Sequence, residues 1–194
     1  MRRHDSEDGQ ALVEFALVFP IFILLIVGLI EFSLAFNALL SVNFASRDAA
    51  LLAAEAGEDS GSDCVILASI DADVQPPASR VRIATVRIYW ADSQGNELAA
   101  NVYARTGSFN CTMPNNAVVT VPYTLQSGSN YPENERCSVL AGCPEDPGHT
   151  ELDNIGVSIT YSYSWITPLA QIITLGGTGF TLTHANVMRM EPVL

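Results

Sequence analysis

The chain of 194 residues contains no lysine, only three histidines and only four cysteines. All nine basic residues are arginine, and 21 acidic residues leave a formal net charge of −12. Because nucleic acids and anionic lipid surfaces attract basic proteins, this balance excludes binding to either of them by general electrostatic attraction. The acidity is typical of a solvated surface on which like charges repel one another.

Motifs for catalysis are also missing. Neither GxSxG nor HExxH occurs, and the histidines His4, His149 and His184 are far apart in the chain. Acids surround His149 and could bind calcium or another metal, but their spacing matches no established loop, so a solvated loop is the simpler interpretation. These acids are Glu145, Asp146, Glu151 and Asp153. We predict no catalytic residue, no metal site and no cofactor.

One long apolar run near the start organises the rest of the chain. No charged or strongly polar residue occurs between Glu14 and Glu31. A helix needs about 20 apolar residues to cross a bilayer, so flanking residues on both sides must extend the run. A carboxylate at the centre would cost about 2.5–3.5 kcal/mol, but these two acids stand at the edges. We predict a transmembrane segment over about residues 12–35.

The helix is predicted to continue beyond the membrane. Strong helix formers follow as far as Ala56, and Gly57 is a typical stop signal. Apolar residues recur at three- and four-residue spacing and form one face, so this second half is amphipathic. They are Val42, Ala45, Ala49, Leu52 and Ala56. From Gln10 to Ala56 the helix would be about 70 Å long at 1.5 Å per residue.

All four cysteines follow this helix. An even number of cysteines in an exported protein indicates two disulfides, for which three pairings are possible. Cys137 and Cys143 enclose a short loop and are the safest pair, which leaves Cys64 with Cys111. The alternative is free thiols buried in a reducing compartment. Since no CxxC occurs, neither a thioredoxin-like redox site nor a zinc ribbon is indicated.

The charges at the N-terminus set the predicted orientation. Arg2 and Arg3 precede the apolar run, and the next basic residue is Arg47. The positive-inside rule then places the N-terminus in the cytoplasm and the cysteines outside. The predicted organisation is a leader or cytoplasmic stub (1–9), a long helix (10–57) and an extracytoplasmic domain (58–194).

Beyond the helix the pattern changes from helix to strand. A short helix over Val65–Ile70 is expected first, followed by strands over 81–90, 97–105, 117–123 and 180–190. Residues 155–165 alternate between apolar and small polar side chains, which predicts a strand with one buried and one solvated face. Residues 126–154 form a long loop in which the Cys137–Cys143 pair would act as a staple. We predict an α+β fold in which the amphipathic half of the helix covers a small antiparallel sheet.

The segment Gly9-Gln10-Ala11-Leu12-Val13-Glu14-Phe15-Ala16-Leu17 resembles the TadE-like family of tight-adherence (Flp, type IVb) pilus assembly proteins, which are pilin-like minor pseudopilins. The likeness extends through Pro20, Gly28 and Ile30-Glu31-Phe32 to Ser46-Arg47-Asp48-Ala49-Ala50. A looser match returns in Thr167-Pro168-Leu169 and in Ala185–Pro192.

The resemblance implies processing by a prepilin peptidase between Gly9 and Gln10, with Glu14 as the fifth residue of the cut chain. Glu14 would then pair with the N-terminal amine of a neighbouring subunit, because an ion pair in lipid costs far less than an isolated carboxylate. Phe15 and Glu31 join it as candidate assembly residues. Gln10 departs from the residue that major pilins more often carry after the glycine.

Each of these residues also has a simpler interpretation. Glu14 could simply be an acid that interacts favourably with the positive end of the helix dipole. Glu31 could be a helix-edge residue near the lipid headgroups. Pro20 and Gly28 could let the membrane helix bend, although both residue types are common in membrane helices.

The sequence therefore predicts a non-enzymatic, pilin-like subunit of the bacterial inner membrane. Its expected partners are the membrane, the prepilin peptidase, other pilin-like subunits and the pilus assembly machinery, with no nucleic acid. The alternative is a single-pass anchor that displays an adhesion or scaffold domain outside the membrane.

Overall fold

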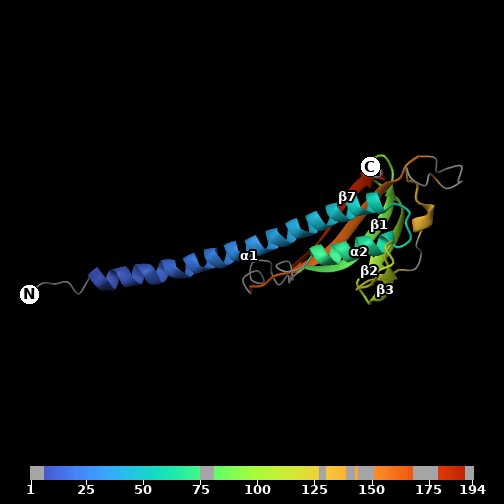
Figure 1. The fold of residues 1–194 in the computed structure, drawn as a ribbon. Helices are drawn as coiled ribbons and strands as arrows, with labels where there is room; N and C mark the ends of the chain where they lie inside the picture. The colour runs from blue at the N-terminus through green and yellow to red at the C-terminus, as the bar shows by residue number, and fades with distance from the viewer. Residues whose placement is uncertain are drawn as a thin grey trace, which may run out of the picture.

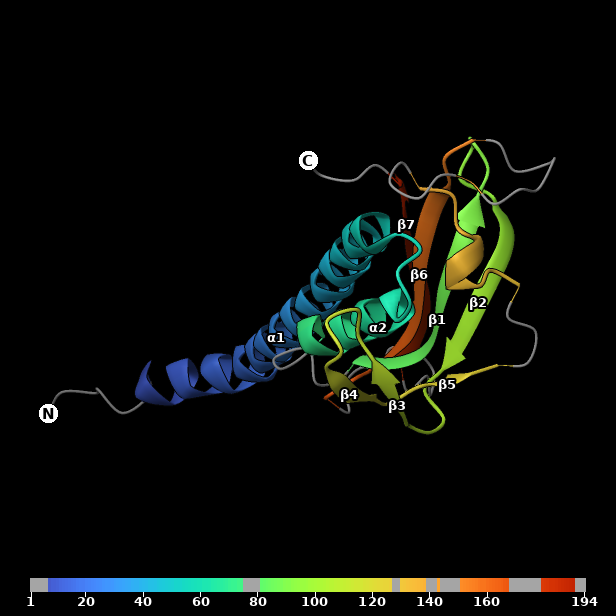
Figure 2. The same ribbon diagram turned by 45° about the vertical axis from the view of Figure 1, so that its right-hand side comes forward.

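The computed structural model describes residues 7–74, 81–126, 130–138, 143, 151–167 and 179–190. Two helices cover one face of an antiparallel sheet, and the first of them extends far beyond it (Figures 1 and 2). The predicted α+β class is confirmed. The predicted leader, residues 1–9, lies partly outside the described residues, and its last three residues already belong to the helix.

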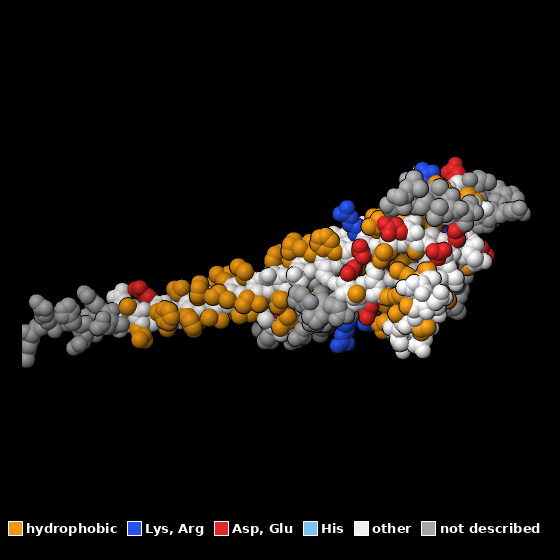
Figure 3. Space-filling model, in the orientation of Figure 1, with side chains coloured by type: hydrophobic (Ala, Val, Ile, Leu, Met, Phe, Trp, Pro, Cys, Tyr) orange, Lys and Arg blue, Asp and Glu red, His pale blue; other side chains and the backbone are white. Residues whose placement is uncertain are grey.

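Helix α1 (Glu7–Ala56) has 50 residues and is unbroken through Pro20. Its first half carries large apolar side chains, and every residue from 9 to 26 is exposed. Figure 3 shows these side chains along the visible face of the helix. The second half packs against strands β6 and β7 and against helix α2. Of the predicted apolar face, Val42, Ala45 and Ala49 are fully buried, but Leu52 and Ala56 are only half-buried.

Helix α2 (Ser62–Asp73) lies beside α1 and is longer than the expected Val65–Ile70. Its side chains Ile66, Leu67 and Ile70 join the core between the helices and the sheet. At its end, the Ser41 hydroxyl of α1 donates a hydrogen bond to the Asp73 carbonyl over 3.2 Å. The two helices are thus held together by apolar packing and by a polar contact.

The main sheet has the order β5-β2-β1-β6-β7, and every neighbouring pair is antiparallel. Its bounds are β1 Val81–Ala91, β2 Glu97–Ala104, β5 Thr124–Leu125, β6 Asn154–Ser164 and β7 Gly179–Arg189. The turn between β1 and β2 needs Gly95 at φ +85°, and Asp92 accepts hydrogen bonds from the Gln94 and Asn96 amides there. The expected strands are therefore present.

Strand β6 differs from its prediction in one respect. The residues predicted to be buried, such as Ile155 and Val157, are buried, but Gly156 and Ser158 on the opposite face are buried too. The ring of Tyr89 lies over Gly156, so closely that a Cβ there would be 2.2 Å from the ring. Neighbouring strands thus cover the outer face of β6, which the pattern of β6 alone could not show.

A second, two-stranded sheet was predicted only in part. Strand β4 (Val118–Val121) is shorter than the expected 117–123, and it pairs with β3 (Phe109–Thr112), which no sequence pattern indicated. The predicted loop 126–154 contains the 3-10 helix η1 (Glu133–Glu135). Part of this loop is built into the core, since Tyr131 and Cys137 are buried.

Candidate assembly site on the long helix

The residues of the predicted processing site lie on the first turns of α1. Gly9, Gln10, Glu14 and Phe15 are all exposed, and a Cβ added to Gly9 would have no other atom within 4 Å. The Gln10 amide donates a hydrogen bond to Glu14 over 3.1 Å. No part of the described fold covers these residues, which leaves them open to an enzyme or to another subunit.

Phe15 stacks in a tilted arrangement on Phe19, with ring centroids 5.1 Å apart. Pro20 and Gly28 follow within the same continuous helix, and a Cβ on Gly28 would have no neighbour within 4 Å. Neither residue is needed for close packing in this structure. Bending at these two positions stays a prediction.

Glu31 is buried, unlike an ordinary helix-edge residue near headgroups, and it contacts its own chain 135 residues later. Its carboxylate accepts hydrogen bonds from the Ile166 amide (2.9 Å), the Thr167 amide (2.8 Å) and the Tyr163 hydroxyl (3.3 Å). These donors lie at the end of β6 and in the segment that follows it. Glu31 thus ties the apolar half of α1 to the sheet, and a pairing partner in another subunit would have to compete with these bonds.

Two pairs of segments that carry the family resemblance meet in the fold. Ile30-Glu31-Phe32 meets Thr167 through the Glu31 carboxylate. Ser46, which is fully buried, accepts a hydrogen bond of 2.7 Å from the Asn186 amide on β7. The C-terminal motif residues thus hold the long helix against the sheet. Pro168, Leu169 and Pro192 lie outside the described residues.

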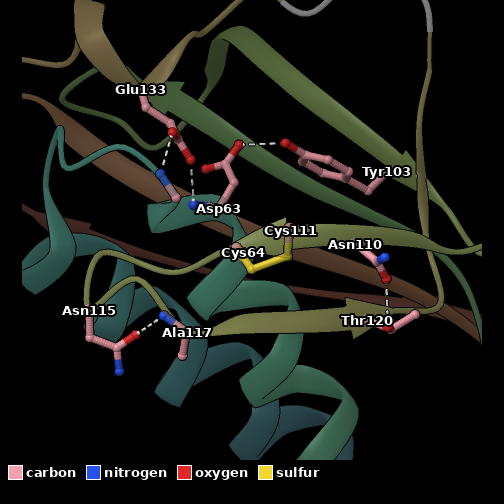
Figure 4. Close-up of a disulfide and its surroundings, with 10 residues drawn as sticks. Asp63, Cys64, Tyr103, Asn110, Cys111, Asn115, Ala117, Thr120 and Glu133 are labelled. Atoms are coloured by element: carbon pink, nitrogen blue, oxygen red, sulfur yellow. Dashed lines mark hydrogen bonds between the residues drawn. A yellow bond between two sulfur atoms is a disulfide. The ribbon is translucent and has the colours of Figure 1, made fainter.

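Both disulfides have the predicted pairing, Cys64–Cys111 and Cys137–Cys143. The first joins α2 to β3 and lies next to Asp63 in a polar cluster (Figure 4). Glu133 accepts hydrogen bonds from the amides of Gly61 (2.7 Å) and Asp63 (2.8 Å), and so caps the start of α2 from a distant segment.

A buried cation, which the sequence did not single out, completes this cluster. Arg136 is 1% exposed; its guanidinium forms an ion pair with Asp63 and donates to the Ser62 hydroxyl over 2.7 Å. Burial by itself lowers the pKa of Arg136, but the charge and hydrogen bond of Asp63, together with the nearby Tyr131 and Glu133, outweigh burial and leave the pKa raised. The pair links the end of η1 to the start of α2, and both of its members are buried.

Tyrosines surround the same cluster. The hydroxyl of Tyr103 donates to Asp63 over 2.7 Å, and that of Tyr131 donates to Asp153 over 2.6 Å. Burial and the adjacent carboxylate raise the pKa of both tyrosines. They therefore stay neutral hydrogen-bond donors, and each satisfies a buried acid.

The predicted acidic loop is not a solvated loop throughout. Asp153 is fully buried and accepts hydrogen bonds from Tyr131 and from the Cys137 amide. Glu151 is exposed, and Glu145, Asp146 and His149 lie outside the described residues. In the described ranges, no three histidine, cysteine or acidic side chains form a group that could hold a metal ion. His184 stacks on Tyr161, with ring centroids 6.0 Å apart.

The fold and this site define an α+β protein built on one long N-terminal helix, the first half of which is apolar enough to cross a membrane. The model of the TadE-like protein family matches residues 9–51, so the resemblance predicted from these residues is confirmed. The match begins at the predicted processing glycine and indicates a function connected with the Tad pilus. Comparisons with curated proteins and with solved structures give no match.

Proposed function

We propose that the protein is a pilin-like minor pseudopilin that takes part in assembling a Tad-type pilus. The observation that carries the proposal is the family match over residues 9–51, which covers the processing position, the apolar helix and most of the part of α1 that is buried on the sheet. In this proposal α1 anchors the chain in the bacterial inner membrane, with its N-terminus in the cytoplasm. A prepilin peptidase then cuts between Gly9 and Gln10.

The two disulfides support an extracytoplasmic position for the sheet. Disulfides form and persist in oxidising compartments such as the bacterial periplasm, and both bridges lie in the globular part. The helix also has the length and composition that a membrane span requires, and none of its most apolar stretch is buried within the protein. The position of the disulfides agrees with the orientation predicted from Arg2 and Arg3.

Exposed side chains on α1 support assembly by lateral helix packing. Phe32, Phe36, Leu40 and Phe44 are between 37% and 72% exposed, and they follow one another at four-residue spacing beyond Glu31. Residues at this spacing share one side of a helix. Helices of neighbouring subunits would cover this side, while Glu14 pairs with the new N-terminal amine of an adjacent chain.

The first test is the replacement Glu14→Ala in the native cell. Glu14 is exposed, and the hydrogen bond that its carboxylate accepts comes from Gln10 on the same helix. The fold should therefore be unaffected, whereas surface pili and co-purification with other subunits should be lost. Glu55→Ala removes an exposed acid from the same helix outside the apolar half, and should leave both intact. Normal assembly in the Glu14 variant would contradict the proposal.

A second test addresses processing. The mature protein should begin at Gln10 by mass spectrometry, and Gly9→Ala should leave the chain uncut because the peptidase reads the glycine. Since a Cβ at Gly9 meets no other atom within 4 Å, a loss of cleavage cannot be attributed to misfolding. A chain that begins at Met1 in wild-type cells would favour the alternative of a fixed anchor that displays an adhesion domain.

A further inference from the structure

The contact between Glu31 and the segment after β6 places part of the globular region at a definite height along the helix. Glu31 is 6% exposed and is held by Tyr163, Ile166 and Thr167. Two of these three hydrogen bonds come from backbone amides, so their positions do not depend on flexible side chains. Wherever Glu31 lies in a membrane, these residues lie at the same depth.

The length of the apolar helix fixes that depth. Glu14 and Glu31 are separated by about 26 Å along the helix axis at 1.5 Å per residue. The hydrocarbon core of a bilayer is about 30 Å thick, so a span between the two acids brings each to an edge of the core. Large apolar side chains between them, such as Leu17 and Leu24, are exposed. Glu31 therefore stands at the outer edge.

The side chains gathered around Glu31 are of the kind found at that edge. Trp165 packs edge-on against Tyr163 and Phe180, with ring centroids 5.7 and 5.4 Å away. Trp165 is half-buried, and Ile166 beside it is 40% exposed. Tyr163 is 2% exposed and its hydroxyl is turned inward to Glu31, so the outer surface here is formed by Trp165, Ile166 and Phe180. Tryptophan is enriched where membranes meet water.

We propose that the segment Trp165–Thr167, together with Phe180, is a second membrane contact that rests in the outer interface of the bilayer. It would seat the sheet on the lipid surface and end the span near Ile30 instead of the predicted residue 35. The partner that this segment contacts is the phospholipid interface itself. Because the protein is acidic, the contact is apolar and requires no anionic lipid.

The two tryptophans of the chain allow a direct test. Trp90 on β1 pairs with Ile155 at one end of β6, whereas Trp165 follows the other end. The length of β6 separates them by roughly 30 Å at about 3.3 Å per residue. Trp90→Phe leaves Trp165 as the only tryptophan, and Trp165→Phe leaves Trp90. Should Trp90→Phe not fold, Trp90→Tyr serves in its place.

Both full-length variants are reconstituted in neutral phosphatidylcholine vesicles with acyl chains brominated near the carbonyl, since bromine quenches tryptophan on contact. We expect the fluorescence of Trp165 to fall roughly twofold relative to unbrominated vesicles, and that of Trp90 to stay unchanged, because of these two tryptophans only Trp165 would lie at the depth of the bromine atoms. Equal signals with and without bromine for Trp165 would overturn the inference.

This inference rests on the membrane span of the proposed function, so a third protein separates the two. Phe22→Trp in a chain that lacks both native tryptophans places a reporter in the middle of the apolar half. This protein is measured in vesicles whose acyl chains are brominated near their methyl ends, because bromine quenches only on contact and position 22 would lie near the centre of the bilayer. Quenching of Trp at position 22 without quenching of Trp165 would keep the span and reject the interfacial contact. No quenching at position 22 would reject the span itself, and with it the depth assigned to Glu31.

Discussion

The two halves of α1 share one backbone conformation but carry different kinds of apolar side chain. Between Leu12 and Ile30 the helix carries phenylalanine, leucine and isoleucine, and these residues have no sheet to cover them. The second half buries small side chains against the sheet. These are Ala38, Val42, Ala45, Ala49, Ala50, Ala53 and Ala54.

This difference shows that apolar content alone does not define a core. A helix surrounded by lipid needs bulk and no particular shape, whereas a helix packed on a sheet needs a surface that complements the strands. Small residues let α1 approach β6 and β7 closely, and Ser46 can then reach Asn186. Changes in the packed half should therefore alter unfolding, while changes in the apolar half should alter only insertion and assembly.

The largest effect on the free energy of unfolding is expected from a residue of the globular part that has no role in the membrane span. Arg136→Ala leaves the Asp63 carboxylate buried without its partner and should lower the free energy of unfolding by about 3–5 kcal/mol. Denaturant titration of the full chain in detergent, followed by tryptophan fluorescence, measures this. Membrane insertion should not change.

Arg82→Ala is the control, because Arg82 is exposed, and its effect should stay within about 0.5 kcal/mol. The double variant Asp63→Asn with Arg136→Met should recover part of the loss, since it leaves no unpaired charge in the core. Equal stability of the Arg136 and Arg82 variants would show that the buried pair is not what joins η1 to α2.

Removing a disulfide should have the next largest effect on stability, and the two bridges should differ in the size of that effect. The bridges span sequence separations of 47 and 6 residues. On the chain-entropy model, removing the bridge of the longer loop lowers the free energy of unfolding by about 4 kcal/mol, and removing that of the shorter loop lowers it by about 2 kcal/mol. Alanine at Cys64 and Cys111, compared with alanine at Cys137 and Cys143 by the same titration, checks this order. A larger loss from the short loop would contradict it.

The smallest effect is expected when alanine is replaced by leucine, and the same replacement can be made in both halves of the helix. Ala49→Leu forces a larger side chain into the fully buried contact with the sheet and should cost about 1–3 kcal/mol. Ala16→Leu adds the same atoms to an exposed position in the apolar half and should leave unfolding of the globular part unchanged. If both variants unfold alike, the contrast between the halves is not one of packing.

Several elements followed from local patterns in the sequence. The apolar run, the helix end at Gly57, the alternation of β6 and the turn at Asp92–Asn96 each depend on neighbouring residues, so the sequence predicted them. The pairing of Cys64 with Cys111 followed once the shorter loop was assigned. Family likeness to the TadE-like proteins was also visible in residues 9–51.

Other features depended on contacts between distant residues. Three features arise where distant parts of the chain meet in the fold. They are the burial of Glu31 under Ile166 and Thr167, the ion pair of Arg136 with Asp63, and the second sheet that β3 forms with β4. No pattern within a few residues of Glu31 distinguishes a carboxylate facing headgroups from one held by the chain's own amides. The sequence determined the long helix and its apolar half, because helix periodicity and hydropathy are local; the tertiary structure alone decided which acids are buried, because burial requires a partner surface.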